Sequence, residues 1–349
     1  MELLVEFIAL VRKELTIQCT DLTHFVALLL MPLLLMLLLT HALRGSFAPG
    51  LGSTAVPVAG DARVVNELIG DDVHVSLASE RSVRDDVRDG RRLVGLIQDH
   101  EGIRVIVDPA FPMAAHGMYQ LLSKAGLNPV AEDPRGRSVD LTKDLSPFNY
   151  TVPGLAIMFL FFLAVFTGFS FYGDVASGAW LRLKASQVPS SIIVAGKIVG
   201  SVIVGLLQLM ILFGIGRLVL GLKFQWIDIP GMLAIFTAVA LVATTFGVML
   251  TALTRTAQQL NLLIYLFVLL FASIGGAIVP IAGLPRALQD LSVFTPHYWA
   301  IRGLRDIMFR GMGYESIPGN IWPLLAEAVI FFAIGITTFR YSRLSKVVY

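Results

Sequence analysis

Six long apolar stretches, with a polar insert between the first and the second, constrain the fold of this chain more than any other feature. Each stretch is close to the roughly 20 residues that an α-helix needs to cross the hydrocarbon core of a bilayer. The mean hydropathy is +0.75, and only 15% of the residues are charged, against about 25% in soluble domains. The pattern therefore predicts an α-helical integral membrane protein with six transmembrane helices.

The same pattern predicts what lies around the crossings. The chain begins with an amphipathic helix, the insert has the rhythm of a small α/β domain, and an outer segment interrupted by Pro280, Pro285 and Pro296 is too short and too polar to span. The predicted segments are the interfacial helix at 1–21, transmembrane helices at 22–43, 152–172, 191–220, 231–253, 259–279 and 321–340, the inserted domain at 44–147, a cytoplasmic loop at 173–190, outer re-entrant helices at 280–320 and a cytoplasmic tail at 341–349.

The interfacial helix is predicted from the spacing of its apolar residues. These residues recur at helical intervals and are Leu4, Phe7, Ile8, Val11 and Leu15. Glu2, Glu6 and Lys13 fall on another side, so the apolar stripe is expected to lie in the membrane interface.

The insert alternates short strands with short helices, an order typical of a small sheet with helices packed on it. Runs rich in Val, Ile and Leu predict strands at 55–59, 73–78, 93–98 and 103–107. The remaining segments predict helices at 62–69, 82–89 and 112–125, and a polar loop at 131–143.

The distribution of basic residues predicts the orientation of the chain. With six crossings both termini share one side, and a cytoplasmic location for that side puts nine lysines and arginines in the cytoplasm against five in the short outer connections. Cytoplasmic segments carry the excess of these residues, whereas a long loop translocates largely regardless of its charge. Both termini are therefore expected in the cytoplasm and the insert outside.

The sequence lacks the patterns of several kinds of site. A phosphate-binding loop needs G-x-x-x-x-G-K-[ST], but Gly196-Lys197 is followed by Ile198, so the chain is not expected to hydrolyse ATP by itself. The six histidines show no metal-ligand spacing, and the single cysteine, Cys19, cannot form an intrachain disulfide or a thiolate metal site. A net charge of only +2 gives no indication of a nucleic-acid partner. No catalytic residue and no metal site are predicted.

The most informative polar stretch is the loop from Tyr172 to Pro189, YGDVASGAWLRLKASQVP. It joins two crossings on the expected cytoplasmic side and contains an acid, two basic residues and a tryptophan. An ordinary solvated loop would have such a composition, and so would a docking surface for a cytoplasmic partner. Composition alone leaves both interpretations open.

The order of residues in this loop resembles that of type-2 ABC exporter permeases, in which an extracytoplasmic domain lies between the first two transmembrane helices. The matching residues are Asp174, Gly178, Leu181, Arg182, Leu183, Ala185, Ser186 and Pro189. Lys197 is similar to the lysine of the family's Gly-Lys at the start of the next helix. Two features depart from the pattern, because Asp174 stands where the family more often has Glu, and Gln187-Val188 precede the proline.

Two other regions share the resemblance. In the insert, one strand leads into Asp61 and a later one ends in Asp108 followed by proline, as in the extracytoplasmic domain of the family. Near the end, the stretch Thr295-Pro-His-Tyr-Trp-Ala and the segment from Arg302 to Arg310 resemble a further family motif. The resemblance therefore covers nearly the whole chain.

The resemblance implies the permease subunit of an ATP-driven exporter that moves a hydrophobic or amphipathic substrate outward across a bacterial inner membrane. ATP and Mg²⁺ would be bound by separate ABC ATPase subunits, and this chain would hold no cofactor. Two permeases, as a homodimer or a heterodimer, would form the path between them in contact with membrane lipid. A periplasmic adaptor is a further partner that the resemblance leaves open.

Coupling and gating residues can also be named. The candidate coupling residues, which by resemblance would dock into the ATPase, are Asp174, Gly178, Leu181, Arg182, Leu183, Ser186 and Pro189. Asp174 and Arg182 would pair with charges of the ATPase or with each other. The candidate outer-gate residues, in the segment that cannot span, are Leu284, Leu288, Leu291, Pro296 and Tyr298. Two short helices there are expected to dip into the outer leaflet and close the path.

Three polar residues within the predicted crossings are candidates for the translocation path. Glu327 would contact the substrate or a cation, or else form a structural hydrogen bond, and its modest depth favours the structural role. Gln208 and Asn261 are polar groups of a kind that more often bridges helices than touches substrate.

Two other classes of function are considered. A non-transporting protein would couple the insert, as a binding module, to a cytoplasmic ATPase, although such relatives usually have four crossings. A secondary transporter would show an inverted repeat, and the insert after the first crossing breaks any such symmetry.

Overall fold

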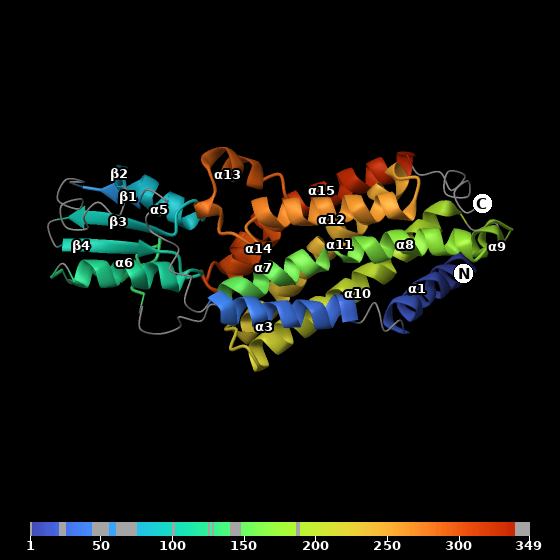
Figure 1. The fold of residues 1–349 in the computed structure, drawn as a ribbon, viewed down its shortest axis with the longest axis horizontal. Helices are drawn as coiled ribbons and strands as arrows, with labels where there is room; N and C mark the ends of the chain where they lie inside the picture. The colour runs from blue at the N-terminus through green and yellow to red at the C-terminus, as the bar shows by residue number, and fades with distance from the viewer. Residues whose placement is uncertain are drawn as a thin grey trace.

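The structure of the chain, a computed structural model, describes residues 2–20, 26–43, 56–60, 75–99, 102–124, 126–127, 129–139, 148–185 and 189–338. The molecule is elongated, with a helical bundle at one end and an α/β domain at the other (Figure 1). Helix α1 (Glu2–Thr20) lies at the end of the bundle remote from the domain, and α15 (Ile317–Thr338) runs toward that same end.

Within the described residues, five helical stretches are long and apolar enough to cross a membrane. They comprise α7 (Phe148–Leu160) with α8 (Leu163–Ala176), α10 (Ser190–Leu218), the turn η3 (Trp226–Asp228) with α11 (Ile229–Leu253), α12 (Ala257–Ile274) and α15. In the place of the first predicted crossing the structure has η1 (Val26–Leu30) and α3 (Met31–Leu43), with a shorter apolar stretch at Leu28–Leu38. The crossing predicted to reach residue 279 ends at Ile274, because glycines follow it and Gly276 is left-handed at φ +83°.

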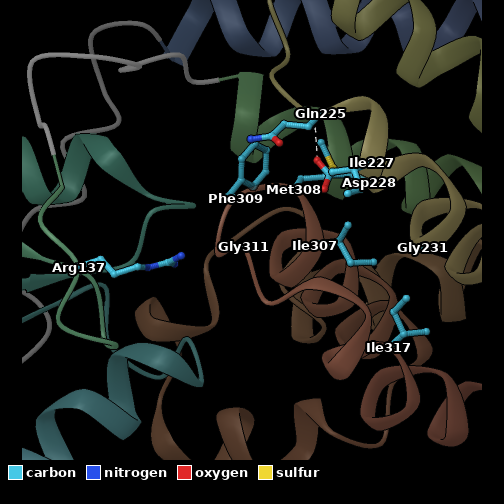
Figure 2. A pocket seen from close by; sticks show the side chains of 10 residues that line it. All are labelled: Arg137, Gln225, Ile227, Asp228, Gly231, Ile307, Met308, Phe309, Gly311 and Ile317. Atoms are coloured by element: carbon cyan, nitrogen blue, oxygen red, sulfur yellow. Dashed lines mark hydrogen bonds between the residues drawn. The ribbon is translucent and has the colours of Figure 1, made fainter.

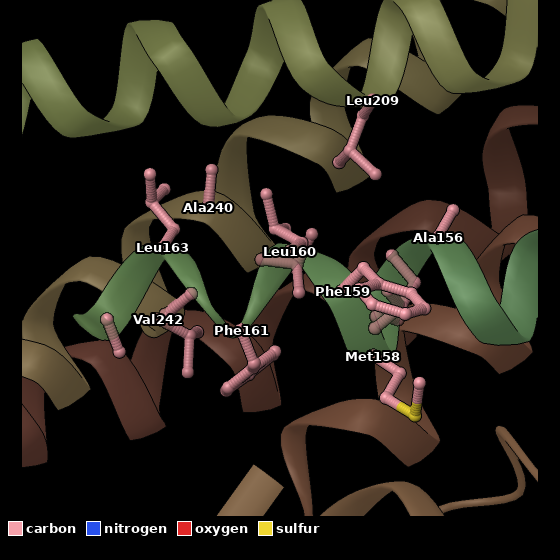
Figure 3. Packing of buried hydrophobic residues seen from close by; sticks show 14 of the residues in the cluster. Ala156, Met158, Phe159, Leu160, Phe161, Leu163, Leu209, Ala240 and Val242 are labelled. Atoms are coloured by element: carbon pink, nitrogen blue, oxygen red, sulfur yellow. The ribbon is translucent and has the colours of Figure 1, made fainter. Parts of the chain in front are cut away.

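A break separates α7 from α8 within a stretch that the sequence predicts as one helix (Figure 3). At the break, the N–H groups of Ala164 and Val165 donate to the carbonyls of Phe161 and Phe162, three residues back, at 3.1 and 2.9 Å. This tighter turn lies in the middle of the bundle, where Phe161 is fully buried and its ring centroid lies 6.4 Å from that of Phe246. The surrounding helices therefore compensate the irregular backbone.

Helix α11 is the centre of the bundle and contacts α8, α10, α15 and the short helix α14 (Pro296–Met308). By contrast, α12 and α15 present apolar side chains on their outer faces, with Leu262 70% and Trp322 69% exposed. Apolar side chains exposed in this way suit contact with lipid or with a second subunit.

The inserted domain is a five-stranded sheet in the order β2-β1-β3-β4-β5. Its strands are β1 (Val56–Ala59), β2 (Val75–Leu77), β3 (Val94–Asp99), β4 (Gly102–Val107) and β5 (Val130–Glu132). Strands β3 and β4 form an antiparallel hairpin, and the other neighbours are parallel. Helix α5 (Glu80–Arg88) covers one face of the sheet, and α6 (Pro112–Lys124) covers the opposite face (Figure 1).

Strand β5 corrects the sequence prediction, which made residues 131–143 a polar loop. Ala131 is buried against the sheet and pairs with Val105 of β4, whereas its neighbours Val130 and Glu132 are exposed or partly exposed. Three residues with one buried side chain are too short to give a recognisable alternation. The helix predicted at 62–69 lies outside the described residues.

The segment that the sequence predicts as re-entrant contains η4 (Ile281–Gly283), α13 (Arg286–Ser292), α14 and η5 (Gly313–Ser316). The sequence predicts two short helices that dip into the outer leaflet, and the structure buries these two helices unequally. Every residue of α14 is buried except Trp299 and Arg302, whereas only Ser292 is buried in α13. The two helices differ because α14 packs against α7, α11 and α15, and its Arg302 pairs with Asp89 of the α/β domain.

Candidate functional site

The candidate coupling residues lie at the end of the bundle farthest from the α/β domain (Figure 1). Helix α8 ends at Ala176, Gly178 turns the chain in a left-handed conformation (φ +69°), and α9 (Ala179–Ala185) follows. Leu181 is 69% exposed, and Arg182 is also exposed. An exposed leucine beside an exposed arginine is a suitable contact surface for another protein.

The other candidate coupling residues take less exposed or different positions. Leu183 is half-buried, and Pro189 is exposed and precedes the first residue of α10. Ser186 lies outside the described residues.

Asp174 does not pair with Arg182, as one of the sequence hypotheses had it. It is buried, and its Oδ2 lies 2.7 Å from Nζ of Lys197 on α10. Its Oδ1 forms an ion pair with Lys13 of α1. Asp174 is therefore occupied within the chain and holds three helices together.

Lys197 is the centre of this group. Its Nζ lies 2.9 Å from Oε1 of Glu14, also donates to Ser170 and lies 4.9 Å from the ring centroid of Phe171. Glu14 accepts a second hydrogen bond from Ser170 at 2.7 Å. We call Lys13, Glu14, Ser170, Asp174 and Lys197 the lysine cluster. Two ammonium groups balance two carboxylates there, which removes most of the cost of burying each charge.

The lysine cluster also shows which side of α1 packs on the bundle, which the sequence prediction did not address. The buried side of α1 carries Leu10, Glu14 and Gln18, whereas Val5 and Ile8 are 62% and 57% exposed. The apolar stripe seen in the sequence is therefore not the side of α1 that packs most tightly. The buried side contains polar residues because α10 supplies their partners, including Ser201 at 3.0 Å from Gln18.

Two glycines of α10 allow α1 to approach this closely. A Cβ atom at Gly196 would lie 2.9 Å from Cβ of Leu10, and one at Gly200 would lie 2.7 Å from Cβ of Glu14. Small residues four apart on one helix face permit such close helix packing. The pattern Gly196-Lys197-x-x-Gly200 is a signal that the sequence reasoning could have used to place a partner helix beside Lys197.

A second buried group joins the α/β domain to α14 and the residues after it. Arg310 donates to both oxygens of Asp108 at 3.1 and 2.6 Å and to Asp306 at 2.7 Å. Asn320 donates to the other oxygen of Asp306 at 3.0 Å. We call Asp108, Asp306 and Arg310 the arginine junction. Burial lowers the pKa of the Arg310 guanidinium, but the charges and hydrogen bonds of the two aspartates outweigh it and leave the pKa raised.

Further contacts fix the domain around α14. Arg137 donates to the backbone carbonyl of Arg310 at 2.8 Å and to Asp133 at 2.6 Å. Nearer the start of α14, Arg302 donates to Asp89 of the domain at 3.0 Å. The domain therefore contacts α14 at Arg302 and the chain just after α14 at Arg310.

Figure 2 shows the cavity of about 440 Å³ beside this contact, with Arg137 on the domain side and Phe309 and Ile317 on the helical side.

His297, which the sequence reasoning set aside, is fully buried near the start of α14. Its ring centroid lies 4.3 Å from that of Phe161 at the break between α7 and α8, and 6.2 Å from that of Phe271. Neither ring nitrogen has a hydrogen-bond partner among the described residues. Burial lowers the pKa of His297 to about 3, so the imidazole is neutral at physiological pH.

The candidate gate residues do not form one surface. Leu284 and Leu288 are half-buried, and Leu291 is 51% exposed. Pro296 and Tyr298 are buried in α14, where the Tyr298 hydroxyl accepts a hydrogen bond from Arg302 at 2.8 Å.

The candidate path residues lie on three different helices, α10, α12 and α15. Gln208 donates to the carbonyl of Leu28 at 3.0 Å, so it bridges α10 to the π-helical η1. Asn261 and Glu327 are partly exposed, and each has one buried oxygen without a hydrogen-bond partner among the described residues. In the same residues no group of three or more His, Cys, Asp or Glu side chains could hold a metal ion.

Comparison with known proteins places these features in a wider group. A model of the ABC-2 type transporter family matches residues 130–309, just over half of the chain. The chain is 29% identical over 164 residues to the linearmycin resistance permease protein LnrN of Bacillus subtilis, covering 47% of this chain and 42% of that protein. It is 29% identical over 118 residues to the inner membrane transport permease YhhJ of Escherichia coli, covering 33% of this chain and 32% of that protein. Each match thus spans less than half of the relative's length.

Proposed function

The chain belongs to the ABC-2 type transporter family, and from this premise we propose that it is the permease subunit of an ABC exporter for a hydrophobic or amphipathic substrate. The observation that carries the proposal is α9, which lies inside the matched region and exposes Leu181 and Arg182 at one end of the bundle. ATP and Mg²⁺ would be bound by separate ATPase subunits that dock there, and this chain would hold no catalytic site.

The proposed topology has six crossings, with η1 and α3 forming the first. Helices α1 and α9 lie at the end of the bundle opposite to the α/β domain (Figure 1). If α9 meets a cytoplasmic ATPase, the termini are cytoplasmic and the domain is extracytoplasmic. The relative described as an inner membrane permease favours the inner membrane of a bacterium.

The path would form between two permeases, identical or related. The exposed apolar faces of α12 and α15 support this arrangement, because one chain leaves them uncovered. Outward movement of an antibiotic-like or lipid-like compound is favoured by the relative named for linearmycin resistance.

Coupling would pass from α9 into the bundle through the lysine cluster. Helix α9 directly follows α8, and α8 carries Ser170 and Asp174. A displacement of α9 by the ATPase would therefore move Asp174 against Lys197 of α10 and Lys13 of α1. The three helices would respond together because their charges are paired and buried.

The test uses a charge reversal at Arg182. The permease is purified with its co-purifying ATPase and reconstituted in proteoliposomes, where ATP hydrolysis and substrate uptake are measured. Arg182→Glu is expected to weaken ATPase association at least about tenfold, since truncating one partner of a buried interface charge pair costs 2–5 kcal/mol, and to abolish transport while the protein still inserts.

The matched control is Arg286→Glu, an exposed charge reversal at the start of α13 near the other end of the bundle. Normal transport by Arg182→Glu would refute the coupling role. ATP hydrolysis without movement of any tested hydrophobic compound would favour the alternative, a non-transporting module that links the domain to the ATPase.

A further inference from the structure

The seam between the α/β domain and the bundle contains a cavity in which arginines from both sides meet. This cavity is distinct from the one in Figure 2, with which it shares no lining residue. It also measures about 440 Å³, within the range of roughly 300–1,000 Å³ that is usual for small-molecule sites. The domain contributes Arg88, from the end of α5, and Arg135. Helix α14 contributes Trp299 and Arg302, its two residues that are not buried. The remaining lining residues are Asp306, Met312, Glu315, Ser316, Gly319 and Asn320.

Two of the three arginines have no carboxylate partner. Arg302 pairs with Asp89, but Arg88 and Arg135 are exposed and form no ion pair within the described residues. Among the described residues, the Arg135 side chain donates one hydrogen bond, to the carbonyl of Gly311 at 3.2 Å. Arginine forks with free donors match the oxygens of phosphate or carboxylate groups.

The carboxylates of the cavity do not cancel these charges. Both oxygens of Asp306 are already bonded, one by Arg310 and the other by Asn320. Glu315 is exposed and has no cationic partner among the described residues. It therefore opposes an anion from one side of the cavity, and the arginine side remains available.

The cavity also lies where a spanning helix begins. Ser316, Gly319 and Asn320 belong to the turn before α15 and to its first turns, and Trp322 follows with its side chain 69% exposed. Tryptophan at such a position is typical of the boundary between hydrocarbon and water. An amphipathic molecule anchored in the adjacent leaflet could thus place its polar head in the cavity and its chain along α15.

From these contacts we infer that the cavity is a binding site for the phosphate head of an anionic membrane lipid, one whose head carries a net negative charge. Arg88 and Arg135 hold the phosphate, Trp299 and Met312 provide apolar contact, and the lipid chain extends into the membrane beside Trp322. A bound phosphate would add a link between the domain and α14. The inference goes beyond the proposed function and does not depend on it, because binding requires neither an ATPase nor transport.

The experiment measures thermal unfolding of the purified full chain in a neutral detergent by tryptophan fluorescence. The probes are dihexanoyl phosphatidic acid, dihexanoyl phosphatidylcholine and inorganic phosphate, each titrated separately. We expect a saturable rise in the unfolding midpoint with phosphatidic acid. Arg88→Gln/Arg135→Gln is expected to weaken its apparent affinity at least about tenfold, because two charge-assisted contacts are lost.

Three variants sharpen the assignment. Arg81→Gln/Arg91→Gln removes the same charge from exposed arginines of the domain that do not line the cavity, and it should bind like the unmodified chain. Glu315→Gln removes the opposing charge and should bind phosphatidic acid more tightly. Arg88→Lys keeps the charge but loses the fork, and its affinity should be intermediate.

Three results would overturn the inference. One is equal affinity of the Arg88→Gln/Arg135→Gln variant and its matched control. Another is inorganic phosphate binding as tightly as phosphatidic acid, since the apolar wall and the lipid chain would then contribute nothing. The third is an equal shift of the unfolding midpoint with phosphatidylcholine, which would mean that binding does not depend on the net negative charge of the lipid head.

Discussion

The lysine cluster and the arginine junction lie at opposite ends of the helical bundle. Both are buried ion pairs that join distant segments, but their central cations differ. At one end, the Lys197 ammonium contacts Glu14, Ser170 and Asp174. At the other end, the Arg310 guanidinium binds both oxygens of Asp108 and one of Asp306. An ammonium is a compact charge with rotatable donors, whereas a guanidinium is a rigid planar fork. The first tolerates sliding of its helices, and the second requires a fixed orientation.

The two groups also differ in the exposed fraction of their outermost side chains. Lys13, at the edge of the lysine cluster, has a side chain that is 33% exposed, although the central Lys197 is only 1% exposed. In the arginine junction the Arg310 side chain is only 9% exposed, and that of Asp108 is fully buried. From this comparison we expect the α9 end to be the more mobile of the two and the domain to keep its position on α14.

The largest expected effect comes from removing the central charge of the lysine cluster. Lys197→Met leaves Glu14 and Asp174 buried with only Lys13 nearby, and breaking a buried pair in this way costs about 3–5 kcal/mol. Thermal unfolding in detergent should show a strongly lowered midpoint. Lys13→Met, at the more exposed partner, should cost about 1 kcal/mol or less.

A compensated variant checks the cause. Adding Glu14→Gln and Asp174→Asn to Lys197→Met removes the uncompensated charges and should recover most of the lost stability, since neutral replacements of buried ion groups are often tolerated. If Lys197→Met is no more harmful than Lys13→Met, the cluster is not the contact that holds α1 to α8 and α10.

A smaller effect is expected when the fork of the arginine junction is replaced by a point charge. Arg310→Lys keeps the charge but cannot bind both oxygens of Asp108, which should cost about 1–3 kcal/mol. Protease cleavage at the seam between the domain and α14 should become faster. A double-mutant cycle with Asp108→Asn should show coupling, whereas one with the half-exposed Asp89→Asn should show almost none. If Arg310→Lys is as stable as the unmodified chain, the planar fork of the arginine junction is not needed, and the two ends do not differ in the geometry that they require.

The last prediction concerns pH and His297, at the start of α14. Burial lowers the pKa of His297 from 6.5 to about 3. Above pH 6.5 the imidazole is neutral in the folded and unfolded states, so its contribution to stability is complete. Below pH 6.5 only the unfolded state binds the proton, and the free energy of unfolding should fall by about 1.4 kcal/mol per pH unit until the folded pKa is reached.

The variant His297→Phe keeps an aromatic ring against Phe161 and removes the titrating group. Its unfolding midpoint should depend less on pH between 6.5 and 4 than that of the unmodified chain. An unchanged pH dependence would show that acid acts elsewhere in the molecule.

Much of the architecture could be predicted from local patterns. The crossings at 191–220 and 231–253 have close counterparts in α10 and in η3 with α11, because a run of apolar residues is recognised without knowing its neighbours. The strands β3 and β4 were predicted for the same reason. The family was also recognised from the sequence, since the order of residues around Asp174 and Arg310 does not depend on their partners.

The candidate site was predicted only in part. Arg182 is exposed, and its docking role stays a prediction, whereas Asp174 is turned inward. The charge distribution of the loop gives no sign of this difference. The burial of polar side chains in α14 was also not predicted. Its apolar residues Ile301 and Leu304 are buried, and so are the polar residues His297, Arg305 and Asp306.

The sequence by itself determined the class of this protein, its segments and its family, because hydropathy and periodicity are properties of neighbouring residues. Only the tertiary structure decided which charges are buried and with whom they pair. Glu14 and Lys197 are 183 residues apart in the chain, and Asp108 and Arg310 are 202 apart. A charge can be buried when an opposite charge and hydrogen-bond donors reach it. Whether they do depends on how distant helices and the inserted domain pack, and no local pattern records that.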